Sequence, residues 1–321
     1  MKFRAHETFF IRKGWLYKGL KNVTQDPCVF VSKERNPIDV LGLGSNMVKS
    51  LRYWMKATGL TEESSARGRT SSQTLTSLAQ IIYKEDRYFE ELGTLYLIHY
   101  MLATDVDLAT SWYAFFNEFK QKEFNREDFT NYVKSSFLNM KNKEDGKNKS
   151  EVAASSIDDD FNCLVNSYVQ RKKLNPTRVN PESNIECPLD ELGLIDLVDK
   201  KNKIFKKTSP KSGMVDPYIL YAVMVDFERR ENLRKTLSND ADESTEIVPT
   251  KEIKISTLLT EKGNIGKVFN LDINALSKEL DKMSKLGLVD VVRTAGLDVV
   301  KLKSDMNFNE CVEEYYSKLN G

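Results

Sequence analysis

The sequence predicts a mainly α-helical protein, in which a helical N-terminal domain is followed by winged-helix-like modules with short β-hairpins. Three observations predict this class. Apolar residues recur at helical spacing over most of the chain. Two helix-type segments end at a glycine and are followed by alternating segments typical of a hairpin. Two charged stretches of low hydrophobicity divide the 321 residues into predicted domains 1–145, 146–240 and 241–321.

The basic N-terminal domain is predicted to be helical apart from one short strand and one loop. Gly14 weakens its first helix, and Asn125-Arg126-Glu127-Asp128 is typical of a helix start with acidic residues in the first turn. The aromatic residues after position 108 are expected to fill a core. In order, we expect a helix over 7–21, a strand over 28–31, a glycine-rich turn and helix over 42–59, a polar loop over 62–76, and helices over 75–83, 92–103 and 109–119.

The two following modules each combine a glycine-ended helix with a hairpin. In the middle module we expect helices over 157–169, 188–195 and 217–230, with a hairpin formed by 194–198 and 203–207. In the last module a helix over 270–286 ends at Gly287 and precedes strands over 288–292 and 297–302. Helix, glycine and hairpin in this order predict a winged helix. Winged helices bind DNA and also dock protein partners, and the mixed charge of 270–286 favours docking slightly.

Composition places any nucleic-acid surface near the N-terminus. The formal net charge is +1, yet residues 1–72 hold thirteen Lys and Arg against six Asp and Glu. Such a basic end suits a polyanionic partner. Cys28, Cys163, Cys187 and Cys311 are scattered without metal-ligand or redox spacing, which is typical of a reducing compartment. Because no segment is long and apolar enough to span a bilayer, we expect a cytoplasmic protein without a membrane partner.

The strongest candidate for DNA contact is the helix that follows the Gly42-Leu43-Gly44 turn. Its cations are three and four residues apart, so they share one face, and the free N–H groups at its start favour an anion. The alternative is an ordinary amphipathic helix with a solvated charged face. An Arg-Gly-Arg run in the next loop could enter a minor groove or be a plain exposed loop. The candidate DNA-binding residues are Gly44, Asn46, Lys49, Arg52, Lys56, Arg67 and Arg69.

A second group of candidates lies in the first eighteen residues. His6 next to Glu7, with Arg12 and Lys18 downstream, offers a general base beside cations that could hold a phosphate. This would be a minimal set for cleaving a phosphodiester. The alternative is that His6 caps a helix or packs in the core. His99, inside the most apolar helix, is expected to be a core histidine.

Several chemistries find no support in the sequence. Gly42-x-Gly44-x-x-Met47 lacks the third glycine of a dinucleotide fingerprint, and Lys49-Ser50 lacks the glycine that precedes lysine in a P-loop. Asp158-Asp159-Asp160 could bind a hard cation, but capping of the following helix is the preferred interpretation. No metal ligands are therefore assigned. If the protein cleaves DNA, a divalent metal, Mg²⁺ or Mn²⁺, is the candidate cofactor.

Several blocks resemble the signatures of a known family. His6-Glu7-Thr8-Phe9 with Arg12 and Trp15-Leu16 resembles its N-terminal block, and Leu41-Gly42-Leu43-Gly44 with Arg52-Tyr53-Trp54 resembles its second. The others are Gly93-Thr94-Leu95, Ile98-His99, Ala109-Thr110-Ser111-Trp112-Tyr113, Cys187-Pro188-Leu189, Leu192-Gly193-Leu194 and Thr294-Ala295-Gly296-Leu297. On these residues the chain is identified as a member of the bacterial domain-of-unknown-function family four thousand and seven.

The resemblance implies a role in DNA phosphorothioation or phage defence. Members of this family occur in such clusters, and some are described as SspB-type DNA nickases. Their partners are a cysteine desulfurase, an ATPase and an ATP-pyrophosphatase-like protein. The implied function is DNA binding, with strand nicking that prepares DNA for sulfur incorporation. The alternative is a non-enzymatic winged-helix adaptor or transcriptional regulator. Phe10 and Ile11 depart from the expected pattern, which leaves the chemistry of the first block open.

Overall fold

The computed structural model describes residues 1–64, 71–139, 152–170, 186–238, 251–294 and 297–320. Two compact units make up the chain, Met1–Thr208 and Ser209–Gly321. Both are mainly helical with small antiparallel sheets, which confirms the predicted class at that level. In the described parts of the chain, no helix is both long and apolar enough to cross a membrane.

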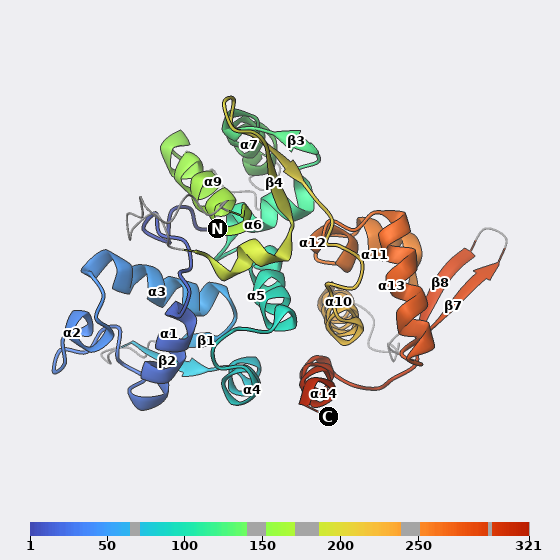
Figure 1. Cartoon of the computed structure of the whole chain (residues 1–321), viewed down its shortest axis with the longest axis horizontal. Coiled ribbons are helices and arrows are strands. Elements are labelled where there is room, and N and C mark those ends of the chain that lie inside the picture. The colour runs from blue at the N-terminus through green and yellow to red at the C-terminus, as the bar shows by residue number, and fades with distance from the viewer. Residues whose placement is uncertain (65–70, 140–151, 171–185, 239–250, 295–296, 321) are drawn as a thin grey trace, which may run out of the picture. The chain divides into compact units, whose positions relative to one another are not determined.

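The first unit is a helical assembly with a two-stranded and a three-stranded sheet (Figure 1). Its elements are α1 (Trp15–Gln25), α2 (Pro37–Leu41), α3 (Ser45–Ala57), β1 (Thr61–Ser64), β2 (Ser72–Leu75), α4 (Ser77–Glu85), α5 (Leu92–Thr104), α6 (Thr110–Tyr113), the π-helix η1 (Ala114–Glu118), β3 (Glu123–Phe124), α7 (Arg126–Tyr132), the π-helix η2 (Val133–Phe137), α9 (Ala154–Tyr168), the 3₁₀-helix η5 (Pro188–Leu192), β4 (Ile195–Asp199) and β5 (Ile204–Lys207).

Three local predictions for the first unit were wrong. The helix expected from residue 7 begins only at Trp15, because Gly14 adopts a left-handed conformation with φ of 82°. Residues 27–31 form turns instead of a strand. The stretch expected to be a loop contains a hairpin, in which β1 and β2 pair from Thr61 opposite Leu75 to Ser64 opposite Ser72. The polar composition of this hairpin concealed its strand pattern.

The core of the first unit lies around α5, as its all-round apolar sequence predicts. Ten of its thirteen residues are buried. A hydrogen bond of 2.8 Å joins the His99 Nδ1 to the Tyr168 hydroxyl. The His99 ring also meets the Phe116 ring edge to face. The prediction of a satisfied core histidine is confirmed. Aromatic rings from η1, β3, α7 and α9 pack on one another, so this aromatic group is core, as predicted.

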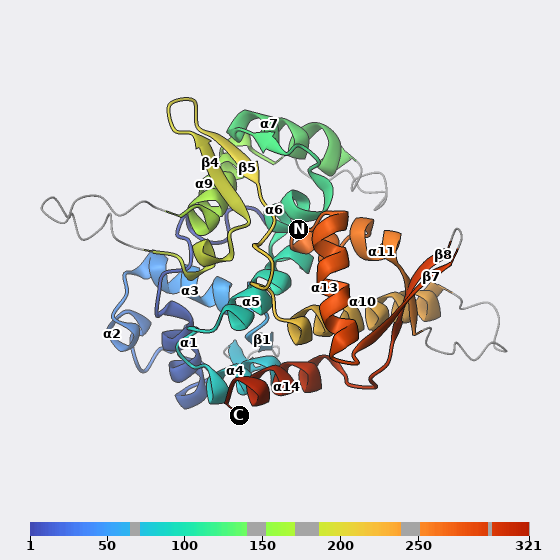
Figure 2. The same cartoon turned by 45° about the vertical axis from the view of Figure 1, so that its right-hand side comes forward.

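A three-stranded sheet joins distant parts of the first unit. Strand β5 pairs with both β4 and β3, and Phe124 lies opposite Phe205. The hairpin expected over 194–207 is therefore present. It pairs with β3, however, which the sequence assigned to the predicted N-terminal domain. Strand β4 packs against α9, and Phe205 of β5 meets Phe161 of α9 edge to face (Figure 2). The unit boundary falls at 208/209, whereas the sequence predicted divisions at 145/146 and 240/241.

The second unit begins with a long helix and closes with another. Its elements are α10 (Pro217–Ser238), β6 (Glu252–Lys254), α11 (Ile255–Thr260), α12 (Ile265–Val268), α13 (Ile273–Lys285), β7 (Val289–Thr294), β8 (Leu297–Leu302) and α14 (Phe308–Asn320). Within this unit α14 packs along α10, and the hairpin β7–β8 follows α13 (Figure 2).

The predicted helix and hairpin at the end of the chain are confirmed. The Asp272 side chain caps α13 by accepting a hydrogen bond from Ala275 N at 2.8 Å. Gly287, with φ of 73°, turns the chain after α13. The strands form an antiparallel sheet of order β6-β8-β7, with Val291 opposite Val300. Leu276, Leu280 and Met283 form the buried face of α13.

Candidate nucleic-acid interface

Helix α3 is held by a buried face and a glycine contact. Leu51, Trp54 and Met55 are fully buried. Gly19 of α1 lets the two helices approach, because a Cβ at this position would lie 2.2 Å from the Met55 sulfur. Gly42 has a left-handed φ of 59° at the end of α2, and Gly44 is extended at the start of α3. The glycine-rich turn therefore fixes where α3 begins and which of its faces is exposed.

The first turn of α3 is open to solvent. Gly44, Asn46 and Lys49 are all exposed. The Lys49 Nζ donates a long hydrogen bond of 3.4 Å to the Asn46 Oδ1, and within the described chain Lys49 forms no ion pair. The predicted contact residues at this end of the helix are thus accessible to a ligand.

The other two predicted cations of α3 already hold a carboxylate. Arg52 Nη2 and Lys56 Nζ, one helical turn apart, contact the two oxygens of Glu63 on β1. Ser71 donates a hydrogen bond of 2.5 Å to Glu63 Oε1, and Arg52 Nη2 donates one of 3.2 Å to Ser71 Oγ. All three charged side chains are at least two-thirds buried. The cations expected to form one open basic face are therefore divided between an open turn and an internal cluster.

The pKa of Glu63 reflects this cluster. Burial raises the pKa, but hydrogen bonds from Lys56, Ser71 and Arg52 outweigh it and lower the pKa from 4.5 to about 2. Glu63 is therefore ionised at neutral pH. The remaining candidates of this group, Arg67 and Arg69, lie outside the described residues.

His6 is buried in the first unit. Its side chain is 1% exposed, and its Nε2 lies 2.8 Å from Asp160 Oδ1 on α9. The ring stacks on Trp54 with 5.8 Å between centroids and 10° between planes, and Trp112 meets its edge. Asp160 also accepts hydrogen bonds from Arg4 N at 2.7 Å and from the Ser111 hydroxyl at 2.5 Å. This network ties the N-terminal segment to α6 and α9.

Within the described chain, no hydrogen bond, ion pair or ring contact joins any two of the four predicted catalytic residues. Glu7 lies in a turn, half-buried, with φ of 51°. The Arg12 guanidinium lies 5.5 Å from the Phe9 ring centroid and 5.3 Å from that of Trp15. The Lys18 Nζ donates a hydrogen bond of 2.7 Å to Leu41 O at the end of α2. His6, Arg12 and Lys18 each contact other groups in this structure, and their joint action on a phosphate stays a prediction.

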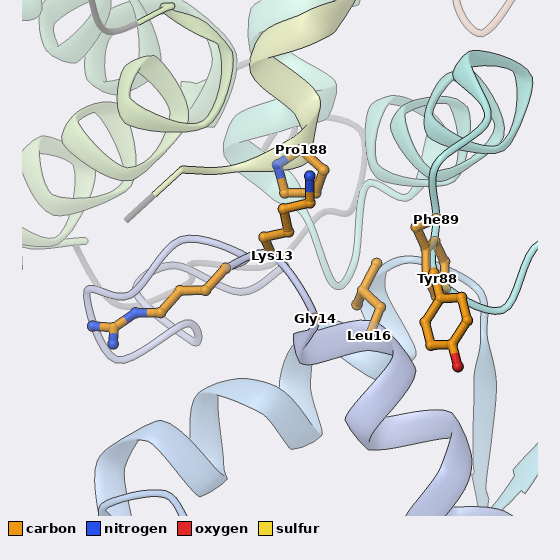
Figure 3. Close-up of a pocket in the computed structure, with 7 residues that line it drawn as sticks. Lys13, Gly14, Leu16, Tyr88, Phe89 and Pro188 are labelled. Carbon is orange, nitrogen blue, oxygen red and sulfur yellow. The ribbon is translucent and has the colours of Figure 1, made fainter. Parts of the chain in front are cut away.

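A shallow hollow lies at the start of α1 (Figure 3). Figure 3 shows the Lys13 side chain extending toward Pro188, with Tyr88 and Phe89 on the other side beside Leu16. Arg12 and Gly14 complete its lining. The walls are largely apolar, and of the four predicted catalytic residues it includes Arg12 alone.

The side chains of the three consecutive aspartates of α9 each contact a different side chain. Helix α9 begins at Ala154, so these residues are not caps, and the capping interpretation was wrong. Asp158 accepts a hydrogen bond from the Thr130 hydroxyl, Asp159 pairs with Arg4, and Asp160 binds His6. Among the described residues, no three His, Cys, Asp or Glu side chains form a group that could hold a metal.

Sequence reasoning considered Asp160 only as a possible cation ligand or helix cap and missed Glu63, although each carried a signal of a buried position. Asp160 is three residues after Ile157 and four before Leu164, so it lies on the buried face of its helix. Glu63 is two residues after the buried Thr61 and therefore faces the same side of β1. A carboxylate on an apolar face is expected to have a buried partner.

Comparison with known proteins gives the family. A profile described as a protein of unknown function, DUF4007, matches residues 3–316. The chain belongs to this family. No curated protein matches it. Two solved structures share its fold over 100% of this chain and 89% of theirs: an SspB crystal structure, with 25% identity and a TM-score of 0.79, and a magnesium ion-bound SspB crystal structure, with 24% identity and a TM-score of 0.77. The predicted family resemblance is confirmed.

Proposed function

We propose that this chain is the SspB-like DNA-binding component of a DNA phosphorothioation or phage-defence system, and that it nicks one strand of a duplex. The observation that carries the proposal is the polar side of α3. There, Lys49 is open to solvent, and Arg52, Lys56 and Ser71 direct their donors at one oxyanion, the Glu63 carboxylate. Two cations and a hydroxyl around paired oxygens suit a backbone phosphate.

Membership of the family and the SspB-like fold support this assignment. By the same resemblance, the expected partners are a cysteine desulfurase, an ATPase and an ATP-pyrophosphatase-like protein. These partners would act on DNA that this chain has bound or nicked.

The described residues do not fit a preformed metal site. One similar structure is titled as magnesium ion-bound, but here the acidic residues of α9 are taken up by Thr130, Arg4, Ser111 and His6. We therefore derive no step through a metal. His6, Glu7, Arg12 and Lys18 stay the predicted catalytic residues. The contacts of His6 with Asp160 and Trp54 also support a role for it in holding the N-terminal segment in place.

A second function, that of a non-enzymatic adaptor, is favoured by the second unit. We infer a winged-helix-like module from its order β6, α11, α12, α13, β7, β8 and its antiparallel sheet of order β6-β8-β7. The cation Lys282 of α13 pairs with Glu279, which is buried. A helix whose cations are partly neutralised suits a protein partner better than a duplex.

A plasmid assay distinguishes the two functions. The full chain is incubated with supercoiled plasmid in Mg²⁺, in Mn²⁺ and in EDTA, and duplex binding is measured in parallel. We expect duplex binding in all three conditions and relaxed circles in at least one of them. Glu7→Gln is the variant of choice, because Glu7 is half-buried and its loss should leave the fold intact.

Binding without relaxation under every condition would favour the adaptor. Relaxation that Glu7→Gln retains in full would remove Glu7 from the catalytic set. Absence of duplex binding by the folded chain contradicts the proposal itself.

A further inference from the structure

The Glu63 carboxylate occupies the position where Arg52 and Lys56 of α3 would bind an anionic ligand. It contacts Arg52 and Lys56 with one oxygen each, and Ser71 donates to the oxygen that Arg52 contacts. The Arg52 and Lys56 side chains are 31% and 19% exposed, so solvent reaches the cluster. A carboxylate held by two cations and a hydroxyl has the charge and the hydrogen-bond demand of a phosphodiester oxygen pair.

The backbone around this cluster is fixed independently of Glu63. Gln73, opposite Glu63 in the hairpin, donates a hydrogen bond of 3.1 Å to Arg52 O. The Thr61 hydroxyl donates one of 3.1 Å to Gln73 Oε1, and the Thr76 hydroxyl donates one of 2.7 Å to Gly59 O. These bonds hold the base of the hairpin on α3. Glu63 could therefore leave its cations through side-chain rotation while the donors stay in place.

The balance of charge in the cluster favours exchange with a polyanion. Two cations face one carboxylate, so the cluster keeps a net positive charge while its donors are satisfied. The lowered pKa of Glu63 means that protonation does not release the cations near neutral pH. Their release requires a competing anion. A duplex supplies closely spaced phosphates together with the entropy of counterion release.

We propose that Glu63 is an autoinhibitory latch, which occupies a phosphodiester-binding site formed by Arg52, Lys56 and Ser71 and withdraws when a backbone phosphate takes its place. This inference rests on the proposed DNA-binding function. It assigns Ser71 as a phosphate donor and makes Glu63 a determinant of affinity. The latch weakens binding to isolated anions more than binding to a duplex, because Lys49 at the open turn adds a contact only for an extended ligand.

The test compares Glu63→Gln with Glu62→Gln. Both variants remove one negative charge from β1, but Glu62 is exposed and has no cation partner among the described residues. Binding of a labelled 20-base-pair duplex is measured by fluorescence anisotropy at one salt concentration. We expect Glu63→Gln to bind about five- to tenfold more tightly than the native chain, as expected for removing two partly exposed ion pairs. Glu62→Gln should change affinity less than twofold.

Equal affinities of Glu63→Gln and Glu62→Gln would overturn the latch. Failure of every variant to bind duplex would instead contradict the proposed function. In that case the latch is tested with inorganic phosphate, which should raise the melting temperature of Glu63→Gln and not that of the native chain; equal shifts would overturn it. Should Glu63→Gln fail to fold, Glu63→Asp shortens the side chain while keeping its charge. A folded Glu63→Asp with native affinity would overturn the latch as well.

Discussion

Replacing Asp160 by alanine is expected to lower the free energy of unfolding of the first unit by about 4 kcal/mol. The substitution leaves Arg4 N, the Ser111 hydroxyl and His6 Nε2 without their partner, in a site where Asp160 is 2% exposed. Each unsatisfied buried polar group costs about 1–3 kcal/mol. Urea unfolding followed by tryptophan fluorescence measures the change, because all three tryptophans lie in the first unit.

Asp159→Ala is the matched control for this prediction. Asp159 is the adjacent residue and pairs with Arg4 at 2.9 Å, but the two side chains are 58% (Arg4) and 32% (Asp159) exposed, so solvent screens the pair. Its loss should therefore cost less than about 1 kcal/mol. If both variants unfold at the same urea concentration, the buried network around His6 does not hold the N-terminal segment in the way described.

The second large effect is expected at Gly266 in α12. A Cβ at this position would lie 2.5 Å from the Leu259 Cα and carbonyl oxygen and 2.8 Å from the Leu258 carbonyl oxygen. These are backbone atoms, which cannot rotate out of the way. We expect Gly266→Ala to destabilise the second unit by about 3 kcal/mol. Hydrogen–deuterium exchange of peptides from α11 to α14 should become faster.

Lys267→Ala serves as the control on the same helix. The Lys267 backbone bond to Asn264 O does not involve its side chain, which is half-buried. Exchange in the second unit should then stay close to native. Native exchange rates in Gly266→Ala would mean that α11 and α12 are not packed this closely.

The helical elements could be predicted from the sequence because their signals are local. The apolar run of α5 and the Asp272 cap with Gly287 after α13 depend on residues a few positions apart. The first helix shows the limit of such signals. Its apolar pattern extends back to Phe9, but one left-handed glycine delays its start to Trp15.

The division into units and the assembly of the site depend on contacts that local patterns do not contain. Strand β3 pairs with β5 across some eighty residues, which places the β4–β5 hairpin of the predicted middle module in the same unit as the N-terminal helices. Likewise, the spacing of Arg52 and Lys56 on α3 was visible, but their partner Glu63 lies on a strand in a stretch of polar composition. Helical spacing in the sequence identified Arg52 and Lys56 as neighbouring cations, but only the tertiary structure shows that both contact Glu63.

The central claim is that the cations of α3 bind the backbone of a duplex, and the salt dependence of binding tests it most directly. The affinity for a 20-base-pair duplex is measured over a range of salt concentrations for the native chain and for Lys49→Gln/Arg52→Gln/Lys56→Gln, with folding verified by tryptophan fluorescence. Each lost phosphate contact should flatten the plot of log affinity against log salt by about 0.9. We predict weaker binding and a slope reduced by roughly three in the triple variant. A folded triple variant with the native affinity and slope would contradict the account.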